Sequence, residues 1–512
     1  MKASQKIRMN FLWIVFLIPT FAMAQQAVDW SFNYGGSSAD VLSRIINSSS
    51  GGFLASGFSM SSDADLPSND GGYDAWAIKI TETGQKEFVT VLGGSSSDYA
   101  KDIVEVDGSH YLMLIDSYSS DGDFPVNLGN SDVWIKSFSL DGSIAGSLHF
   151  GGSGDDNAIR LIPAAAGGHL IIGRTNSSDG TFVEGYGGYD GFCIRLTQNS
   201  QVAWVKQFGT KENDGFVDAL TLPDGNLLFL GSIYQTTQNT GWLLKTNSLG
   251  ESITEKRIEK ASGIFPVCIQ HHAGHIYVAA NTNNLVSRVT DRHMIIYKFD
   301  ENLDFVGSIE TGGAGGSDMI LDMKPYDNNH LLCLITSNTD NWPFQGNHGG
   351  YDLFYALYSN DFELVHTRPF GGSNNEGMSG QNGNFVLDGT NAIAASNSNS
   401  SDGDVPANYG LADGWIFKAN PTYSLGLPQF EKDILPGMII QPNPASDYIE
   451  VLDIPENSSI ISICNLTGQT IKTHDLQPGI NRFSVNDLPP GLYILHAHGK
   501  GTITASARFI KQ

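Results

Sequence analysis

The stretch FGGSGDD (150–156) recurs along the chain and sets the spacing of the segments around it. Closely related stretches, here called heads, are YGGSSAD (34–40), LGGSSSD (92–98) and FGTKEND (208–214). Their first glycines, Gly35, Gly93, Gly151 and Gly209, are each 58 residues apart. Two looser heads follow, TGGAGGSD (311–318) and FGGSNNE (370–376), and the 162 residues from Gly209 to Gly371 hold three units of about 54 residues. A regular period of this length indicates a repeat architecture, and the spacing predicts seven units between Tyr34 and Lys418.

Each unit contains four short apolar stretches separated by turns. In the third unit they are NAIRLIPA (157–164), AAGGHLIIG (165–173), YDGFCIRL (189–196) and QVAWVKQF (201–208). Four short antiparallel strands in 50–60 residues are typical of one blade of a β-propeller. We therefore predict an all-β fold with a seven-bladed β-propeller over residues 25–420. Strand spacing of this kind also fits a sandwich or a barrel, but neither explains a regular seven-fold unit.

The two ends of the repeat do not contain complete sets of four strands. The last unit has only three strands and ends at WIFKA (415–419), whereas an extra strand, VDWSFNY (28–34), precedes the first head. We predict that residues 28–33 complete the last blade as its outer strand, beside residues 413–418. The ring would then close without a covalent link, with Trp30 and Phe32 on one side of the closing strand.

The first 24 residues have the pattern of a secretory signal peptide. Three basic residues precede the apolar run FLWIVFLIPTF (11–21), which is followed by Ala22-Met23-Ala24. We expect cleavage between Ala24 and Gln25 and therefore export through the inner membrane. No later run of about 18 apolar residues occurs, so we expect no transmembrane segment in the mature chain.

A second module follows the repeats. The segment PTYSLGLPQFEKDILP (421–436) breaks the pattern, and we interpret residues 421–438 as a linker. Residues 439–512 hold short strands such as YIEVLD (448–453) and GLYILHAH (491–498), separated by turns that contain Pro, Gly and Asn. This pattern predicts a small Ig-like β-sandwich.

Both modules resemble known families. The motifs FGGSxxD, SSDGDFP and GGYDxWIxKL resemble the seven-bladed β-propeller repeats of secreted bacterial proteins over about residues 27–418, a resemblance that implies a fold and not a function. Three motifs near the C-terminus resemble the type A sorting domain of the type IX secretion system. That resemblance implies recognition by the type IX secretion machinery of Bacteroidota, release or attachment at the cell surface, and removal of the domain by cleavage. Its motif residues are Pro442, Asn443, Pro444, Gly491, Tyr493 and Lys511.

Composition and motifs narrow the function classes. With 29 Lys and Arg against 54 Asp and Glu, the chain has a formal net charge of −25, which argues against nucleic acid as a partner. No G-x-S-x-G, H-E-x-x-H, P-loop or EF-hand motif occurs, so we predict neither catalytic nor metal-binding residues, no cofactor and no enzyme activity. The cluster His271, His272 and His275 is more simply structural than metal-binding, because other units also place a histidine just after the same hairpin turn.

Acidic residues recur at fixed positions relative to the head glycines, and we take the face that carries them as the candidate ligand-binding face. Each head ends in an acid, and a second set lies in the long loop after the second strand of a unit. Since both connections emerge on one face of a propeller, we expect Asp98 and Asp123 on the same face. Asp and Ser side chains also cap their own turns, which is the simpler role for each residue alone. The candidates are Asp40, Asp98, Asp156, Asp214, Asp318 and Glu376 in the heads, and Asp63, Asp65, Asp121, Asp123, Asp402 and Asp404 in the loops.

The sequence therefore predicts an exported binding or interaction scaffold with an acidic face. Its expected partners are the type IX machinery and an extracellular protein or glycan. A divalent cation on the acidic face is an alternative that no motif supports. Two further functions stay open: a hydrolase or lyase that acts on polysaccharide through a carboxylate site, and a purely structural or adhesive surface protein.

Overall fold

The computed structural model describes residues 28–422, apart from 165–166, 236–237, 284–291, 314 and 378–382. It also describes residues 438–511, apart from 442, 444, 453, 456–457, 465–469, 477–480, 490 and 500–501. This part of the chain consists of strands and turns, and it holds no helix with the length and apolar character needed to span a membrane. The chain divides into two compact units after Tyr423. The predicted signal peptide, with Ala24 and Gln25, and most of the predicted linker lie outside the described residues.

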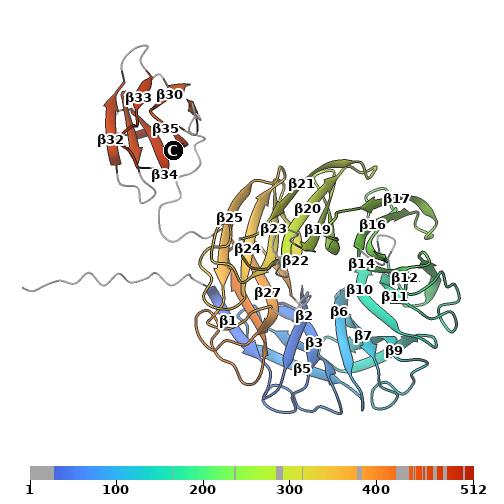
Figure 1. The fold of residues 1–512 in the computed structure, drawn as a ribbon. Coiled ribbons are helices and arrows are strands. Elements are labelled where there is room, and N and C mark those ends of the chain that lie inside the picture. Colours follow the sequence, from blue (N-terminus) through green and yellow to red (C-terminus); the bar gives the residue numbers. More distant parts are fainter. Residues whose placement is uncertain are drawn as a thin grey trace, which may run out of the picture. The chain divides into compact units, whose positions relative to one another are not determined.

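The first unit is a ring of seven four-stranded antiparallel sheets among its described residues (Figure 1). This arrangement confirms the predicted all-β propeller fold. We call the seven sheets blades 1 to 7. Listed from the inner to the outer strand, blade 1 holds β2 (Asp40–Asn47), β3 (Phe53–Ser59), β4 (Asp74–Ile80) and β5 (Lys86–Leu92), and blade 2 holds β6 (Asp98–Val106), β7 (His110–Ser117), β8 (Asp132–Ser139) and β9 (Ile144–Phe150). In the same order, blade 3 holds β10 (Asp156–Pro163), β11 (His169–Thr175), β12 (Asp190–Leu196) and β13 (Val202–Phe208), blade 4 holds β14 (Asn213–Thr221), β15 (Leu227–Gln235), β16 (Gln238–Thr246) and β17 (Ser252–Ile258), and blade 5 holds β18 (Phe265–His272), β19 (His275–Asn283), β20 (Arg292–Phe299) and β21 (Phe305–Thr311). Blade 6 holds β22 (Asp318–Asp327), β23 (His330–Ser337), β24 (Asp352–Ser359) and β25 (Leu364–Phe370), and blade 7 holds β26 (Asn384–Asp388), β27 (Asn391–Ser398), β28 (Asp413–Ala419) and β1 (Val28–Tyr34).

Local sequence explains the hairpins within a blade. The turn between β6 and β7 contains Asp107 and Gly108, whose φ angles are 47° and 65°. Two consecutive positive φ angles belong to the tight turn whose twist matches antiparallel strands, and an Asp-Gly pair adopts them at low cost. The middle strands of a blade, such as β4 and β7, are buried along nearly their whole length, because each blade packs on both of its faces against its neighbours.

The hydrophobic core lies between blades. Seven apolar clusters in the described propeller each draw side chains from two adjacent blades, and together they run around the whole ring. Trp76 of blade 1, for example, is fully buried in one cluster with Ile393 and Ile416 of blade 7. A fully buried side chain of this size contributes about 1.5–3 kcal/mol or more. No blade can therefore keep its core without both neighbours.

The N-terminal strand closes the ring, as the strand count predicts. β1 pairs with β28 in antiparallel register, with Phe32 opposite Ile416, and it is the outer strand of blade 7. Its aromatic side chains face blade 1 instead. Trp30 Nε1 donates to the carbonyl of Glu82 at 3.0 Å, and the Trp30 ring lies 6.2 Å from that of Phe53. β1 thus hydrogen-bonds to one blade and packs on the next, which places blue β1 at the edge of the orange blade 7 in Figure 1.

The second unit is a small sandwich, as expected. One sheet holds three strands, β29 (Ile439–Gln441), β30 (Tyr448–Leu452) and β33 (Arg482–Ser484). The other holds four strands, β32 (Thr470–Asp475), β31 (Ile460–Cys464), β34 (Gly491–Gly499) and β35 (Thr502–Lys511). A single apolar cluster draws on both sheets, with Ile449 and Phe483 from the first and Leu495 and Phe509 from the second.

Candidate functional site

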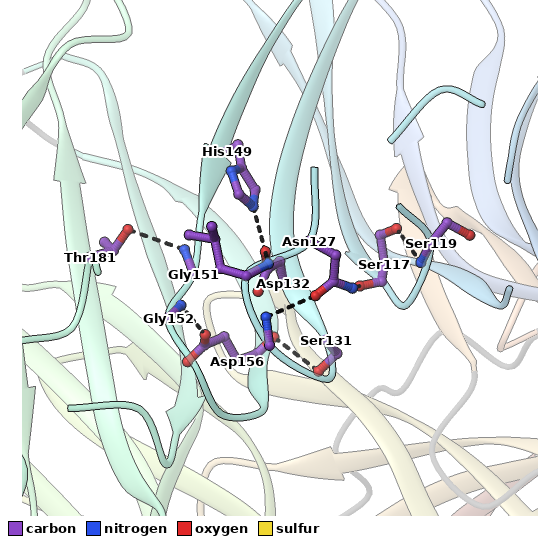
Figure 2. A network of polar contacts seen from close by, with 12 residues as sticks. Ser117, Ser119, Asn127, Ser131, Asp132, His149, Gly151, Gly152, Asp156 and Thr181 are labelled. Carbon is purple, nitrogen blue, oxygen red and sulfur yellow. Dashed lines mark hydrogen bonds and ion pairs between the residues drawn. The ribbon is translucent and has the colours of Figure 1, made fainter. Parts of the chain in front are cut away.

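The heads are built by side chains that return to their own backbone. In the head before blade 3, the N–H of Gly152 donates to Asp156 Oδ2 at 2.7 Å, and that of Ser153 donates to Asp179 Oδ1 at 2.7 Å. The N–H of Gly151 donates to the hydroxyl of Thr181 at 3.1 Å (Figure 2). The head carries the first acid and the long loop after β11 carries the other two side chains. Hydrogen bonds therefore join the head to the loop, and we call this arrangement the head latch.

The same head latch recurs in other blades. The acid that ends a head is buried and accepts from a nearby head N–H, and it also accepts from Ser or Thr hydroxyls at the end of the second strand. The head acids Asp40, Asp98, Asp156, Asp214, Asp318 and Glu376 accept from the N–H groups of Gly36, Gly94, Gly152, Thr210, Gly313 and Gly372, respectively. Asp214 differs from the others, because its hydroxyl partner is Thr210 of the head and not a residue of the second strand. These predicted ligand residues are therefore turned inward, onto their own turns.

The loop acids bind the neighbouring N–H groups of the same heads. Asp63, Asp121 and Asp402 accept from the N–H of the fourth head residue at 2.7–2.8 Å, and Asp65, Asp123 and Asp404 accept from that of the first head glycine at 3.0–3.3 Å. Asp98 and Asp123 thus lie at one head and on one face of the propeller, which we call the head face.

The exposed loop acids stay ionised. The backbone N–H of Ser95 holds the pKa of Asp121 below its usual value, and the N–H groups of Ser37 and Ser373 do the same for Asp63 and Asp402. No group of three or more His, Cys, Asp or Glu side chains in the described part of the chain is placed to hold a metal ion. The acids thus contribute negative charge to the head face while their oxygens bind the backbone.

Close approach explains why the heads begin with two glycines. A Cβ atom on Gly93 would lie 2.3 Å from Asp74 Cγ, and one on Gly94 would lie 2.6 Å from Ser119 Cβ. Neither glycine has a positive φ, so the requirement is for space and not for an unusual backbone conformation. Asp74 begins β4 and belongs to a second set of buried acids, which the sequence analysis did not single out. The others are Asp132, Asp190, Asp352 and Asp413.

Each of these acids lies close to a head acid, and the resulting pairs of carboxyl groups differ in their neighbours. Burial, together with the neighbouring Asp98 carboxylate, raises the pKa of Asp74 to about 6. Burial likewise raises the pKa of Asp98 to about 6. In the next head an imidazole joins the pair, because His149 Nε2 lies 2.6 Å from Asp132 Oδ2 (Figure 2). The head between blades 1 and 2 therefore holds two buried carboxyls that compete for one charge.

This competition predicts a pH dependence of stability. Because the folded-state pKa of Asp74 lies above its ordinary value of 3.8, the folded chain binds more protons than the unfolded chain between about pH 4 and 6. The free energy of unfolding contributed by this group therefore falls as the pH rises through that window. Asp74→Asn keeps an acceptor for the N–H of Asp70, whose distance to Asp74 Oδ2 is 2.8 Å, and removes the charge.

We expect Asp74→Asn to raise the thermal midpoint of the propeller at pH 8 by about 1–3 °C and to change it less at pH 5. Calorimetry of the mature chain at both pH values measures this. Asp121→Asn is the matched control, since it removes an exposed acid that is ionised at both values. A midpoint lowered equally at pH 5 and pH 8 by Asp74→Asn would contradict the assignment.

A ring of polar residues fills the centre of the propeller and was missed by the sequence analysis. Asp102 of blade 2 links blades 1 and 3, because Arg44 Nε lies 2.9 Å from its Oδ1 and Arg160 Nε lies 3.1 Å from its Oδ2. Arg160 Nη1 then lies 3.2 Å from Asp218 Oδ1. These four residues come nine positions after the first glycine of their heads, so their common phase was a visible signal. The central ring consists of Arg44, Asp102, Arg160, Asp218, Cys268, Asp322 and Asn384, one from each inner strand.

The ring also closes across the last blade. Asn384 Nδ2 donates to Asp322 Oδ2 at 3.1 Å, and Asn384 Oδ1 accepts from the N–H of Ile45 at 2.6 Å. Lys324 Nζ lies 3.0 Å from Asp322 Oδ2. The charges of the central ring are therefore directed at one another across the blade boundaries, which makes the ring a structural element and not an open site.

Aromatic side chains of blades 1 and 2 gather on the head face. The ring of Phe58 lies 5.2 Å from that of Tyr73 and 5.0 Å from that of Tyr99, and Tyr99 lies 6.2 Å from Tyr118. The backbone N–H groups of Tyr73 and Tyr118 donate to the hydroxyl and the carbonyl of Ser97, a head residue, at 3.2 and 3.0 Å. Tyr118 is 42% exposed. We call Phe58, Tyr73, Tyr99 and Tyr118 the aromatic platform.

The platform is bordered by cations that already have partners. Lys101 Nζ lies 5.2 Å from the centre of the Tyr99 ring and 3.4 Å from Asp116 Oδ2. Arg174 of blade 3 lies 4.8 Å from the centre of the Tyr189 ring. The platform is specific to these blades, because the residues 58 positions before and after Tyr99 are Val41 and Asn157.

Blade 4 carries a separate pocket of about 260 Å³. It opens at the degenerate head after Gly209 and combines two carboxylates with two cations. Its lining residues are Thr210, Lys211, Glu212, Ile233, Gln235, Thr240, Arg257 and Glu259.

The C-terminal motifs come together in the second unit. Lys511 pairs with Gly491 in the register of β34 and β35 and forms an isolated bridge with Ala445. Asn443 Nδ2 donates to the carbonyl of Arg508 at 3.1 Å, and the Tyr493 hydroxyl donates to that of Pro489 at 2.9 Å. Pro442 and Pro444 lie outside the described residues. The start, the late turn and the end of the module thus form one local assembly.

The family match agrees with this division. Residues 440–512 match the family described as secretion system C-terminal sorting domain. No curated protein matches the chain. Among solved structures, the chain is similar to Drosophila Semaphorin 2a (8% identity, 94% of this chain and 97% of that one, TM-score 0.44). It is also similar to the WD40 domain of Toxoplasma gondii coronin (9%, 79% and 90%, 0.42) and to the β-propeller domain of the Trilobed protease from Pyrococcus furiosus (10%, 78% and 99%, 0.41).

Proposed function

We propose that this protein is a non-enzymatic binding scaffold that acts outside the cell and engages a protein partner through the aromatic platform. Its C-terminal sorting domain implies type IX secretion to the cell surface or the exterior. The propeller is then the cargo and the sorting domain its export signal.

The aromatic platform is the observation that carries the proposal. The head and loop acids that repeat around the ring are engaged with their own turns, so a repeated acidic site is a weaker candidate. The platform occurs once, it is held by two backbone contacts to Ser97, and Tyr118 at its edge is 42% exposed. Clustered Tyr, Phe and Arg side chains are the groups that contribute most binding energy in protein interfaces.

A polysaccharide hydrolase or lyase is the second candidate, favoured by the pocket of blade 4. Glu212 and Glu259 line that pocket together, and glycoside hydrolysis uses a pair of carboxyl groups across the bound sugar. Incubation of the mature chain with polysaccharides, followed by detection of new reducing or unsaturated ends, distinguishes this function from binding alone.

The binding proposal is tested with a double variant, Tyr99→Ala/Tyr118→Ala. We expect it to lose at least tenfold in affinity for whichever member of an array of extracellular proteins and glycans the mature chain binds, since truncated anchors at an interface cost about 2 kcal/mol or more. Tyr234→Ala is the matched control, because Tyr234 is 56% exposed but belongs to blade 4. Equal affinity of the double variant and the parent chain for every bound array member would refute the proposal.

A further inference from the structure

We propose that the aromatic platform recognises a cationic polypeptide segment, one that presents Lys or Arg side chains to the tyrosine rings. This inference rests on the proposed function and adds the chemistry of the partner. It follows from the charge around the platform, from the pairing of the platform's own cations, and from contacts that the rings already make.

The unbalanced charge beside the platform is negative. Asp121 follows Tyr118 by three residues and is exposed, and the N–H of Ser95 keeps its pKa low, so it is ionised at neutral pH. Asp70 precedes Tyr73 by three residues and is also exposed. Two platform tyrosines, Tyr73 and Tyr118, therefore each have an exposed carboxylate three residues away in the chain.

The cations near the platform do not offset this charge. Lys101 is paired with Asp116, which is 2% exposed. Arg174 stacks on Tyr189, whose hydroxyl donates to Asp155 Oδ2 at 2.7 Å. Lys101 is thus neutralised by Asp116, and the exposed Arg174 is set against two exposed carboxylates, Asp70 and Asp121, so a negative charge remains in excess.

Tyr99 of the platform, and Tyr189 outside it, already contact cations within the protein. Lys101 lies 5.2 Å from the centre of Tyr99 and Arg174 lies 4.8 Å from the centre of Tyr189, both within the range of a cation–π contact. Tyr118 presents a ring of the same kind to solvent. A Lys or Arg from a partner would find in Tyr118 a ring of the kind that Lys101 already contacts, with the exposed Asp121 carboxylate three residues further along the chain.

The charge of the whole chain acts in the same direction. With a formal net charge of −25, the chain attracts cationic partners over long range and repels acidic polysaccharides. Association should therefore be fast at low ionic strength and should weaken as salt is added.

The test uses octa-arginine, octa-glutamate and maltoheptaose as probes of the mature chain, with affinities measured by calorimetry at 50 and 300 mM NaCl. We expect octa-arginine to bind, to bind at least tenfold more weakly to Tyr99→Ala/Tyr118→Ala, and to bind Tyr234→Ala as it binds the parent chain. Asp121→Asn should weaken binding several-fold and flatten its salt dependence.

Two outcomes would overturn the inference. Octa-arginine that fails to bind, or that binds the parent and the double variant equally, would show that the platform does not recognise the cation. Platform-dependent binding of octa-glutamate or maltoheptaose, or of an uncharged or acidic member of the protein and glycan array, would also overturn it. Where the array member is an uncharged or acidic protein the proposed function would stand, whereas a glycan as the platform-dependent ligand, or the absence of any platform-dependent ligand, would remove both.

Discussion

A chain that lacks β1 should lose the propeller as a cooperative unit. Deletion of residues 25–33 leaves blade 7 with three strands and exposes the edge of β28. It also removes Trp30 and Phe32 from the apolar cluster between blades 7 and 1. Because every blade shares its core with both neighbours, an opening at this boundary weakens the whole ring and not one blade. We expect the thermal midpoint to fall by more than 10 °C.

Thermal unfolding and limited proteolysis of the parent and truncated chains measure this effect. A synthetic peptide of residues 25–34 should restore part of the lost midpoint when added in excess, since β1 is held by pairing and packing and not by its chain connection alone. A peptide of scrambled sequence is the control. Truncated protein that melts like the parent chain would show that β1 does not close the ring.

Loss of the sorting domain should abolish delivery to the outside. A chain ending at residue 436 keeps all seven blades but lacks the assembly formed by Asn443, Gly491 and Lys511. The two units have separate apolar clusters, so the propeller should fold without the second unit. In a cell with the type IX machinery, we expect the truncated protein to be folded, retained in the periplasm, and at least tenfold depleted from the surface and the medium.

Cell fractionation and protease accessibility on intact cells give the location, and calorimetry of the purified truncated protein gives its folded state. Tyr118→Ala is the export control, because it changes the head face and leaves the second unit intact. Wild-type amounts of the truncated chain in the medium would contradict a sorting role for residues 440–512.

The ring and its closure were predictable because they depend on counting. Heads at a constant spacing define the units, and one surplus strand before Gly35 with one missing after Lys418 allows a simple pairing. Hairpin turns such as Asp107-Gly108 also carry their conformation in their composition. Neither inference requires knowledge of where a side chain points.

The chemistry of the acids was less predictable. Their phase placed Asp98 and Asp123 correctly on one face, but spacing cannot tell whether an oxygen points to solvent or to its own backbone. Asp74 was overlooked because its burial depends on a head 19 residues later in the chain. The aromatic platform was missed for a different reason. Tyr73 and Tyr118 have counterparts at the same phase in other units, such as Tyr189 and Tyr234, and only Tyr99, which brings them together, has none in the units before and after it.

The odd number of positions in the central ring limits how its charges can be arranged. Charges of alternating sign can surround an even number of positions, but seven is odd, so a strict alternation cannot close. Arg44, Asp102, Arg160 and Asp218 alternate, and Cys268 and Asn384 supply neutral positions on either side of Asp322. The blades are therefore not interchangeable copies. Any reordering or duplication of blades that sets two aspartates or two arginines side by side would bring like charges together at the axis, so the order of the blades is part of what the sequence encodes.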